Sequence, residues 1–118
     1  MNAVYQGWLT KQGSFIKNWK RRWFVLTNSD LTYLTAPNGV KKGSIPVKQA
    51  STVEQDTSSK YKNAFKIIIP NGRTYFIYAD NSAEMTQWVT NIEEVRKNAI
   101  IGKFNISMID ISIMGTIA

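Results

Sequence analysis

Seven short β-prone runs with turn signals between them precede a single stretch of helical periodicity in this chain. The runs cover residues 4–11, 19–27, 31–36, 42–47, 51–55, 64–69 and 73–79. The last two flank Pro70-Asn71-Gly72, and an Asn-Gly pair between two β-prone runs favours a hairpin. Many short strands at this spacing are typical of an antiparallel barrel or sandwich. The order of the runs therefore predicts a mostly β fold of seven antiparallel strands.

The period of the apolar residues changes after residue 80. The apolar residues now recur at steps of three and four, which give one apolar stripe on a helix. They are Met85, Trp88, Val89, Ile92 and Val95. Asn81 can cap the start of this helix, and Glu84 three residues later completes the pattern of a capping box. A seven-stranded barrel has an open end, so we expect this amphipathic helix to close it, with Trp88 in the core.

Residues 100–118 fit neither pattern. Between residues 106 and 113 alternate positions are isoleucine-rich, so one face of a strand would be apolar, and a lone half-apolar strand is not stable by itself. A chain of 118 residues has the length of one domain. We therefore expect a domain over residues 4–98, followed over residues 99–118 by a linker and the first strand of a truncated downstream domain.

The chain contains no cysteine and no histidine. This excludes disulfides, zinc sites built from those residues, thiol nucleophiles and imidazole bases. The carboxylates lie in turns or on the polar face of the helix, and none pairs with a nucleophile, so we expect no catalytic site, no metal and no cofactor. Neither a signal-peptide pattern nor an apolar run long enough to span a membrane is visible, and we expect a cytoplasmic protein.

The net charge of +7 comes entirely from the first half of the chain. Residues 1–53 hold eight basic residues and one acid, whereas residues 54–118 hold seven of each sign. Five of the cations lie between positions 11 and 22. A one-sided basic field in a small domain favours an anionic partner, which could be a nucleic acid, an acidic membrane surface or a phosphorylated ligand.

The alternation of side chains along a strand places three of these cations on core-facing sides. Lys11 shares a face with Leu9, and Lys20 and Arg22 share a face with the core residues further along their strand. Both sets of cations lie at the strand ends nearest the loop over residues 12–18. We therefore predict a shallow basic cup, which suits a multiply phosphorylated headgroup because arginine forks onto phosphate oxygens and lysine acts as a point charge.

Phe15 and Ile16 lie at the tip of the same loop, just before Lys17. An exposed Phe-Ile pair beside cations suits shallow insertion into a bilayer interface. Packing of Phe15 against Trp19 is the alternative.

Nucleic acid is the less favoured anionic partner. Trp19 and Trp23 alternate out of phase with Lys20 and Arg22. Base stacking and phosphate contacts would therefore lie on opposite faces of the strand, whereas single-strand binding needs both on one surface. We expect no nucleic-acid partner.

Two motifs and one helix residue together resemble the pleckstrin homology (PH) domain family. They are G-W-L-T-K-Q-G (7–13), W-K-R-R-W-F-V-L (19–26) and Trp88. The resemblance covers residues 4–98. It implies a seven-stranded, partly open antiparallel barrel capped by one C-terminal helix, in agreement with the strand count. It also implies a phosphoinositide-binding module that recruits a protein to the membrane. Many PH domains do not bind lipid tightly, so a protein–protein interaction module on the same fold is the alternative.

The resemblance further implies contact residues. PH domains that bind 3-phosphorylated inositides have a basic residue that ends the first strand and a K/R-x-R step in the second, and Lys11, Lys20 and Arg22 match these positions. In the same subset a tyrosine in the third strand and a basic residue that opens the fourth add contacts, and Tyr33 and Lys42 match these positions. Likeness to Akt (protein kinase B) implies further contacts at Arg73 and Lys48. We also expect Lys17, in the basic loop, among the phosphoinositide contacts. The ligand implied is PIP3 or PI(3,4)P2, between which the sequence does not choose.

Residues 106–115 are similar to the lead-in and first strand of an Akt-like catalytic domain, and they stop before any glycine-rich loop. This likeness implies that the parent protein is a serine/threonine kinase whose kinase domain is an intramolecular partner. It also implies recruitment from the cytoplasm to the plasma membrane. The linker is shorter than is usual in Akt-like kinases.

Overall fold

The computed structural model describes residues 3–103, which form seven strands, a short 3-10 helix and one long α-helix. The elements are β1 (Tyr5–Gln12), β2 (Trp19–Leu26), β3 (Leu31–Leu34), β4 (Lys41–Ile45), η1 (Val47–Gln49), β5 (Thr52–Gln55), β6 (Ala64–Ile68), β7 (Thr74–Tyr78) and α1 (Ser82–Lys103). Every strand expected before residue 80 is present, within two residues of its expected ends. The strand expected within residues 106–115 lies outside the described residues.

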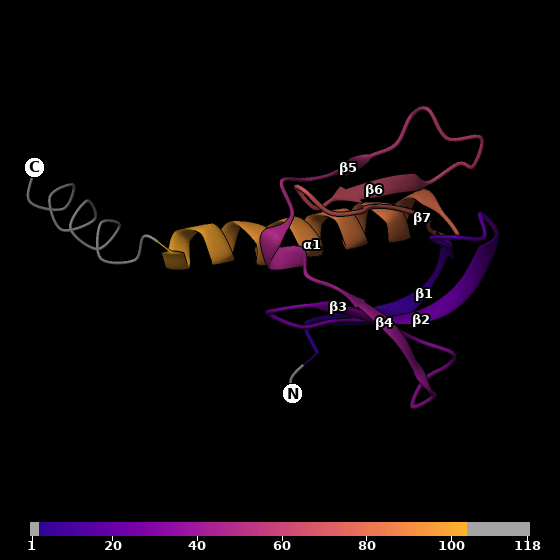
Figure 1. Ribbon diagram of the computed structural model, residues 1–118, viewed down its shortest axis with the longest axis horizontal. Helices are drawn as coiled ribbons and strands as arrows, with labels where there is room; N and C mark the ends of the chain where they lie inside the picture. The colour runs from indigo at the N-terminus through magenta and orange to yellow at the C-terminus, as the bar shows by residue number, and fades with distance from the viewer. Residues whose placement is uncertain (1–2, 104–118) are drawn as a thin grey trace, which may run out of the picture.

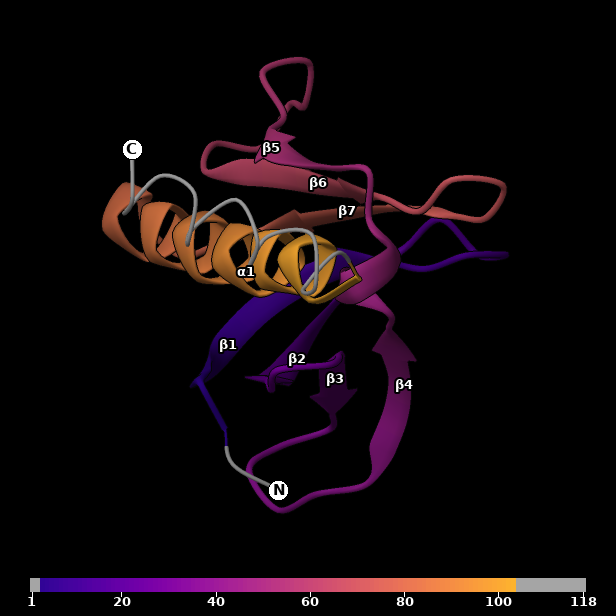
Figure 2. The same ribbon diagram turned by 90° about the vertical axis from the view of Figure 1, so that its left-hand side faces the viewer.

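The strands form one antiparallel sheet in the order β4-β3-β2-β1-β7-β6-β5. β4 and β5 are its edges and do not pair with each other, so the barrel remains partly open. β4 ends at Ile45, directly before Pro46, because proline cannot donate to a ladder. In both Figure 1 and Figure 2, β1–β4 lie on one side of α1 and β5–β7 on the other. The expected seven-stranded, helix-capped, partly open barrel is confirmed.

The start of α1 follows the capping pattern only in part. The Asn81 side-chain oxygen accepts a hydrogen bond from the Glu84 amide at 2.8 Å, as expected of an N-cap. The Glu84 carboxylate accepts a hydrogen bond from the Tyr5 hydroxyl at 3.2 Å, so it ties α1 to β1 instead of completing a capping box. At its other end α1 continues to Lys103, into residues 99–118 that the sequence predicts to be a linker and a further strand.

Trp88 is the centre of the contact between α1 and the barrel. Its side chain is fully buried, with its ring 4.7 Å from that of Tyr5 and 6.3 Å from that of Phe24 between centroids. Gly7 of β1 lies against the same ring, where a Cβ would come within 3.6 Å of the indole. The expectation that Trp88 belongs to the core and that the helix closes the barrel is confirmed.

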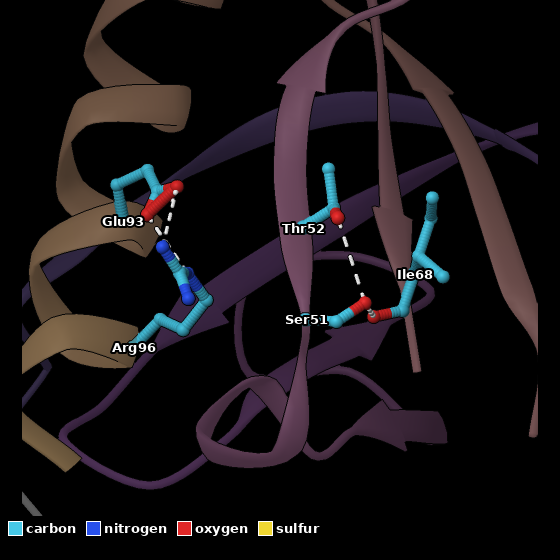
Figure 3. Close-up of polar contacts among 5 residues, drawn as sticks. All are labelled: Ser51, Thr52, Ile68, Glu93 and Arg96. Atoms are coloured by element: carbon cyan, nitrogen blue, oxygen red, sulfur yellow. Dashed lines mark hydrogen bonds and ion pairs between the residues drawn. The ribbon is translucent and has the colours of Figure 1, made fainter. Parts of the chain in front are cut away.

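Figure 3 shows polar contacts on the side of the barrel that α1 covers, and these contacts stabilise the fold. Arg96 and Glu93 of α1 form a forked ion pair with N–O distances of 2.8 and 3.2 Å. The hydroxyl of Ser51, the residue before β5, donates to the Ile68 carbonyl at 3.4 Å. These bonds occupy polar groups close to where α1 contacts η1 and β5.

Three loops lie at the end of the barrel that faces away from the C-terminal end of α1 (Figure 1). They are the connections β1–β2, β3–β4 and β5–β6, and the first of them carries the loop tip singled out in the sequence. Within residues 3–103, no helix has both the length and the apolar character needed to cross a membrane.

Candidate functional site

A cavity of about 400 Å³ opens at the end of the barrel where β1 meets β2. Its lining consists of Lys11, Gly13, Ser14, Asn18, Lys20, Arg22, Tyr33, Lys42 and Arg73. Five of these nine residues are cations and none is acidic. We call this cavity the basic cup. It presents N–H and O–H donors and a concentrated positive charge, which suit a ligand carrying several negative charges.

The pairing of β1 with β2 brings three of the cup's cations together. Lys11 lies directly opposite Lys20, and Arg22 lies opposite Leu9. Directly paired residues of an antiparallel ladder share a face, so all three cations point to the core side, as their alternation predicted. Like charges directly opposite each other destabilise such a pair, so this arrangement costs stability unless an anion binds there.

Arg21, one position away on β2, points to the other face. Its guanidinium forms a forked ion pair with Asp80 at 2.8 and 3.0 Å and lies 5.1 Å from the Trp8 ring. Among the residues that the structure describes, none of the ion pairs includes a cation of the basic cup. The positive charge of the cup is therefore not neutralised by a neighbouring carboxylate in this part of the chain.

Lys11 forms the floor of the cup. Only 8% of its surface is exposed, and its ammonium lies 4.6 Å from the centroid of the Tyr33 ring. Burial, together with the nearby charges of Arg73 and Arg22, lowers the pKa of Lys11 to about 8. Burial also raises the pKa of Tyr33, so its hydroxyl stays protonated and can donate to an anion.

An irregularity in the pairing of β3 with β4 brings Lys42 to the cup. Tyr33 pairs with Gly43 and Leu34 pairs with Lys41, so Lys42 is the extra residue of a β-bulge. A bulge re-aims the side chain it carries. Gly43 is needed here because a Cβ at this position would overlap the Tyr33 phenol. Gly43 was not among the expected site residues, and a glycine within a β-prone run was the only signal for it in the sequence.

The hairpin between β6 and β7 positions Arg73. Asn71 has a φ of 58°, in the left-handed region that follows proline in a type II turn, and the expected hairpin is confirmed. The Arg73 guanidinium donates to the Gln12 carbonyl at 3.0 Å and lies 4.3 Å from the Tyr75 ring. These contacts hold the arginine at the mouth of the cup, although its position is 61 residues from Gln12 in the sequence.

The β1–β2 loop forms one wall of the cup and is tightly closed. The Gly13 amide donates to the Asn18 carbonyl, and the Asn18 amide donates to the Ile16 carbonyl, both at 2.8 Å. A Cβ at Gly13 would overlap the Ile16 carbonyl, so this position requires glycine. Three further lining residues, Gly13, Ser14 and Asn18, were not among the expected contacts, and the Gly-Ser turn signal was the only indication of them in the sequence.

The tip of this loop is exposed. Phe15 is 98% exposed and Ile16 is 74% exposed. Phe15 therefore does not pack against Trp19. That ring instead lies 4.8 Å from Tyr61 and 5.4 Å from Tyr78, in an aromatic cluster. The loop tip, Phe15–Ile16, is thus free to meet another surface.

Lys17 lies beside the cup and not in it. It lines a neighbouring cavity of about 390 Å³, together with Trp19, Lys60, Tyr61 and the buried Asp56. The Asp56 carboxylate accepts hydrogen bonds from the amide and hydroxyl of Ser58, at 3.1 and 2.6 Å. Because this neighbouring cavity holds a carboxylate, it is less suited to an anion than the basic cup.

Lys48, like Lys17, is an expected contact that does not line the basic cup. It lies in η1, after the end of β4. Ile45, the last residue of β4, pairs with Leu31, and Leu31 pairs with Leu26 at the end of β2 opposite to Lys20. β4 thus carries the chain away from the cup before Lys48 is reached, and Lys48 is not among the residues that line it.

Within residues 3–103, no three acidic side chains gather as ligands for a metal ion. The polar groups that do gather belong to the basic cup. The structure brings together six of the expected contacts, namely Lys11, Lys20, Arg22, Tyr33, Lys42 and Arg73. Their role in binding remains a prediction.

Residues 3–97 match the sequence model of the PH domain family. The chain is 34% identical over 86 residues to the RAC family serine/threonine-protein kinase homolog of Dictyostelium discoideum, covering 72% of this chain and 19% of that protein. It is 32% identical over 87 residues to the mouse (Mus musculus) dual adapter for phosphotyrosine and 3-phosphotyrosine and 3-phosphoinositide, covering 71% and 30%. The chain thus spans less than a third of either relative.

The structure is similar to that of the C-terminal PH domain of pleckstrin in complex with D-myo-Ins(1,2,3,4,5)P5. The TM-score is 0.69 at 32% sequence identity, and the match covers 80% of this chain and 98% of that one.

Proposed function

Because this chain belongs to the PH domain family, we propose that its basic cup binds the phosphorylated headgroup of an inositol lipid. A PH domain is a binding module, and its work here is to capture a membrane lipid. The observation that carries the proposal is the set of five cations around one cavity with no acidic residue among them. The inositol pentakisphosphate complex of the pleckstrin domain supports it.

Each residue of the cup has a distinct part in this mechanism. Arg22 and Arg73 fork onto phosphate oxygens, and the second is already oriented by its bond to Gln12. Lys11 supplies a buried point charge on the floor, where a phosphate relieves the repulsion from the two arginines. The Tyr33 hydroxyl donates a neutral hydrogen bond. The binding free energy comes from replacing repulsion within the cup by attraction to the ligand.

Among inositol lipids, we propose that the cup prefers those with a 3-phosphate, PIP3 or PI(3,4)P2. The support is the placement of Lys11, Lys20 and Arg22 at positions that match 3-phosphoinositide binders, and their gathering in one cavity. The mouse relative named for 3-phosphoinositide is consistent with this preference.

The loop tip provides a second attachment to the membrane. Phe15 and Ile16 project from the wall of the cup, with Lys17 next to them. Apolar side chains at the acyl boundary and cations at the headgroup level reinforce each other. We propose that the domain moves from the cytoplasm to the inner face of the plasma membrane when its lipid is made there.

We also propose that the domain serves a serine/threonine kinase. Similarity to the RAC family kinase homolog supports this, as does the likeness of residues 106–115 to the start of a kinase domain. If the lipid binds the PH domain more tightly when the kinase domain is separated from it, lipid binding would shift the population toward the state in which the two domains are apart. Sequencing of the gene tests the proposal: the absence of a downstream glycine-rich loop and strand lysine would exclude a kinase.

Sedimentation with vesicles tests the lipid proposal. Phosphatidylcholine vesicles would carry either PIP3, PI(3,4)P2, or phosphatidylserine at matched negative charge. We expect sedimentation with the 3-phosphoinositides and little with phosphatidylserine. Equal sedimentation with all three would mean that the domain binds any acidic surface through its positive charge and does not recognise the inositol headgroup. Failure with all three would favour the protein–protein interaction module.

A further inference from the structure

The floor of the basic cup holds an amine in an unusual setting. Of the lysines whose burial the structure describes, within residues 3–102, only Lys11 is buried, and it reaches solvent through the cup. The groups that face the same cavity are Lys20 and Arg22 from β2, Tyr33 from β3, Lys42 from β4 and Arg73 before β7. All are cations except the Tyr33 phenol, and none is a carboxylate that would hold the Lys11 ammonium in its charged form.

Burial and like charges both favour the neutral amine. They lower the pKa of Lys11 from 10.5 to about 8. Around pH 8 the neutral fraction of such a lysine is roughly a hundredfold larger than that of an ordinary exposed lysine. A neutral lysine amine carries a free electron pair, and lysines activated next to other cations are the ones that attack carbonyl carbons.

The same cations that activate Lys11 also attract anions. An aldehyde that carries a phosphate would be concentrated in the cup by Arg22 and Arg73, next to the amine. We propose that Lys11 is a covalent modification site for phosphorylated aldehydes, a reactivity that rests on the anion-binding cup of the proposed function. The modification would occupy the cup and block headgroup binding.

The chemistry needs no further reagent. The electron pair of the Lys11 Nζ forms a bond to the carbonyl carbon, and the carbonyl oxygen takes up the proton that the nitrogen releases. The resulting carbinolamine then loses water, which leaves an imine between Lys11 and the aldehyde carbon. The phosphate remains on the cup's arginines and holds the adduct in place.

Pyridoxal 5′-phosphate is a suitable probe, with pyridoxal, which lacks the phosphate, as its matched control. Imines formed at about pH 8 are trapped by reduction with borohydride to stable amines, and peptide mass spectrometry gives the labelled positions. We expect Lys11 to be labelled about ten- to a hundredfold faster than Lys17, Lys48 or Lys60. Pyridoxal should label Lys11 more slowly than its phosphate does, because the arginines of the cup no longer concentrate the aldehyde beside the amine. Excess inositol tetrakisphosphate should protect Lys11 from the phosphorylated probe.

Two variants complete the experiment. Lys11→Arg should remove the fast label, whereas Lys48→Arg, outside the cup, should leave it unchanged, with circular dichroism as the check on folding. Labelling spread evenly over the lysines, or labelling that does not depend on the phosphate, would overturn the proposal. If the protein binds inositol tetrakisphosphate but Lys11 is not selectively labelled, the modification proposal is overturned and the proposed function stands. Selective labelling of a protein that ignores inositol phosphates would instead overturn the proposed function.

Discussion

Arg21 and Arg22 are adjacent on β2 and differ in what they face. The side chain of Arg21 pairs with Asp80 on the outer surface, whereas Arg22 lines the basic cup. Exposed ion pairs contribute little to stability, so Arg21 can be removed without consequence for the fold. The two arginines therefore form a matched pair for testing the site, with equal charge and nearly equal position.

Arg22→Ala should weaken binding of soluble inositol tetrakisphosphate. The lost interaction is a charged, forked hydrogen bond worth roughly 1.5–3 kcal/mol, or about a ten- to 150-fold rise in Kd. Isothermal titration calorimetry measures it directly. Arg21→Ala removes the same charge and should bind within about twofold of the wild type. If both variants lose affinity equally, the ligand responds to the overall field and not to the cup.

Lys11 should make headgroup binding depend on pH. The pKa of Lys11 is about 8 in the free protein, and a bound phosphate raises it because an opposite charge favours the ammonium. The contribution of Lys11 is therefore fully present below pH 8 and is lost as the pH rises through 8 toward the higher pKa of the complex. The ligand phosphates are fully ionised above about pH 7, so they do not add to this decline.

Calorimetry between about pH 7 and 9 tests this dependence. Affinity should fall across the range, and near pH 8 the apparent enthalpy should vary with the ionisation enthalpy of the buffer because Lys11 takes up a proton. Lys11→Arg keeps its charge throughout and should flatten the pH profile. A wild-type profile as flat as that of the variant would contradict a lowered pKa for Lys11.

At the scale of elements, the β1–β2 loop combines a rigid base with an exposed tip. Gly13 and Asn18 close the base by backbone hydrogen bonds, and the tip makes no contact with the barrel that buries it. The base shapes the cup and the tip meets the membrane, so the two roles are separable by mutation.

Replacement of Phe15 and Ile16 by serine should weaken vesicle binding and leave the affinity for soluble headgroup unchanged. Full burial of such side chains is worth about 1.5–3 kcal/mol each, so even shallow insertion predicts roughly a tenfold loss or more. Vesicle sedimentation and calorimetry give the two affinities. Ile101→Ser, on the exposed face of α1, is the control. Loss of both affinities would show that the tip supports the cup.

At the scale of the whole molecule, α1 holds an open barrel together. β4 and β5 do not pair, and α1 lies between the two halves of the sheet (Figure 2). Trp88 contacts Tyr5 and Phe24 in the first half, while α1 also contacts β5 and β6 in the second. The two halves of the sheet are thus joined both by the pairing of β1 with β7 and by their contacts with this helix.

Trp88→Ala should unfold much of the protein at physiological temperature. Truncation of a buried tryptophan costs about 3–5 kcal/mol, a large part of the 5–15 kcal/mol that stabilises a typical domain. A thermal melt followed by circular dichroism measures the loss. Ile100→Ala, at an exposed position of the same helix, should melt close to the wild type. A similar melting temperature for Trp88→Ala would contradict the central place of this ring.

Periodicity in the sequence determined the elements of this protein because the alternation of apolar residues is a local property. The strand and helix periods predicted the order of elements, and strand alternation alone put Lys11, Lys20 and Arg22 on core-facing sides. Both arguments hold whatever the partner strands are, since each depends only on neighbours a few residues away.

Tertiary structure decided the rest of the site. Lys42 enters the cup through a bulge that depends on how β3 and β4 pair, and Lys48 is carried away from it by the course of β4. Arg73 is oriented by a carbonyl 61 residues away, and Glu84 bonds Tyr5 instead of its own helix cap. None of these positions follows from local spacing, because each is set by contacts between strands and helix that form only when the barrel closes around α1.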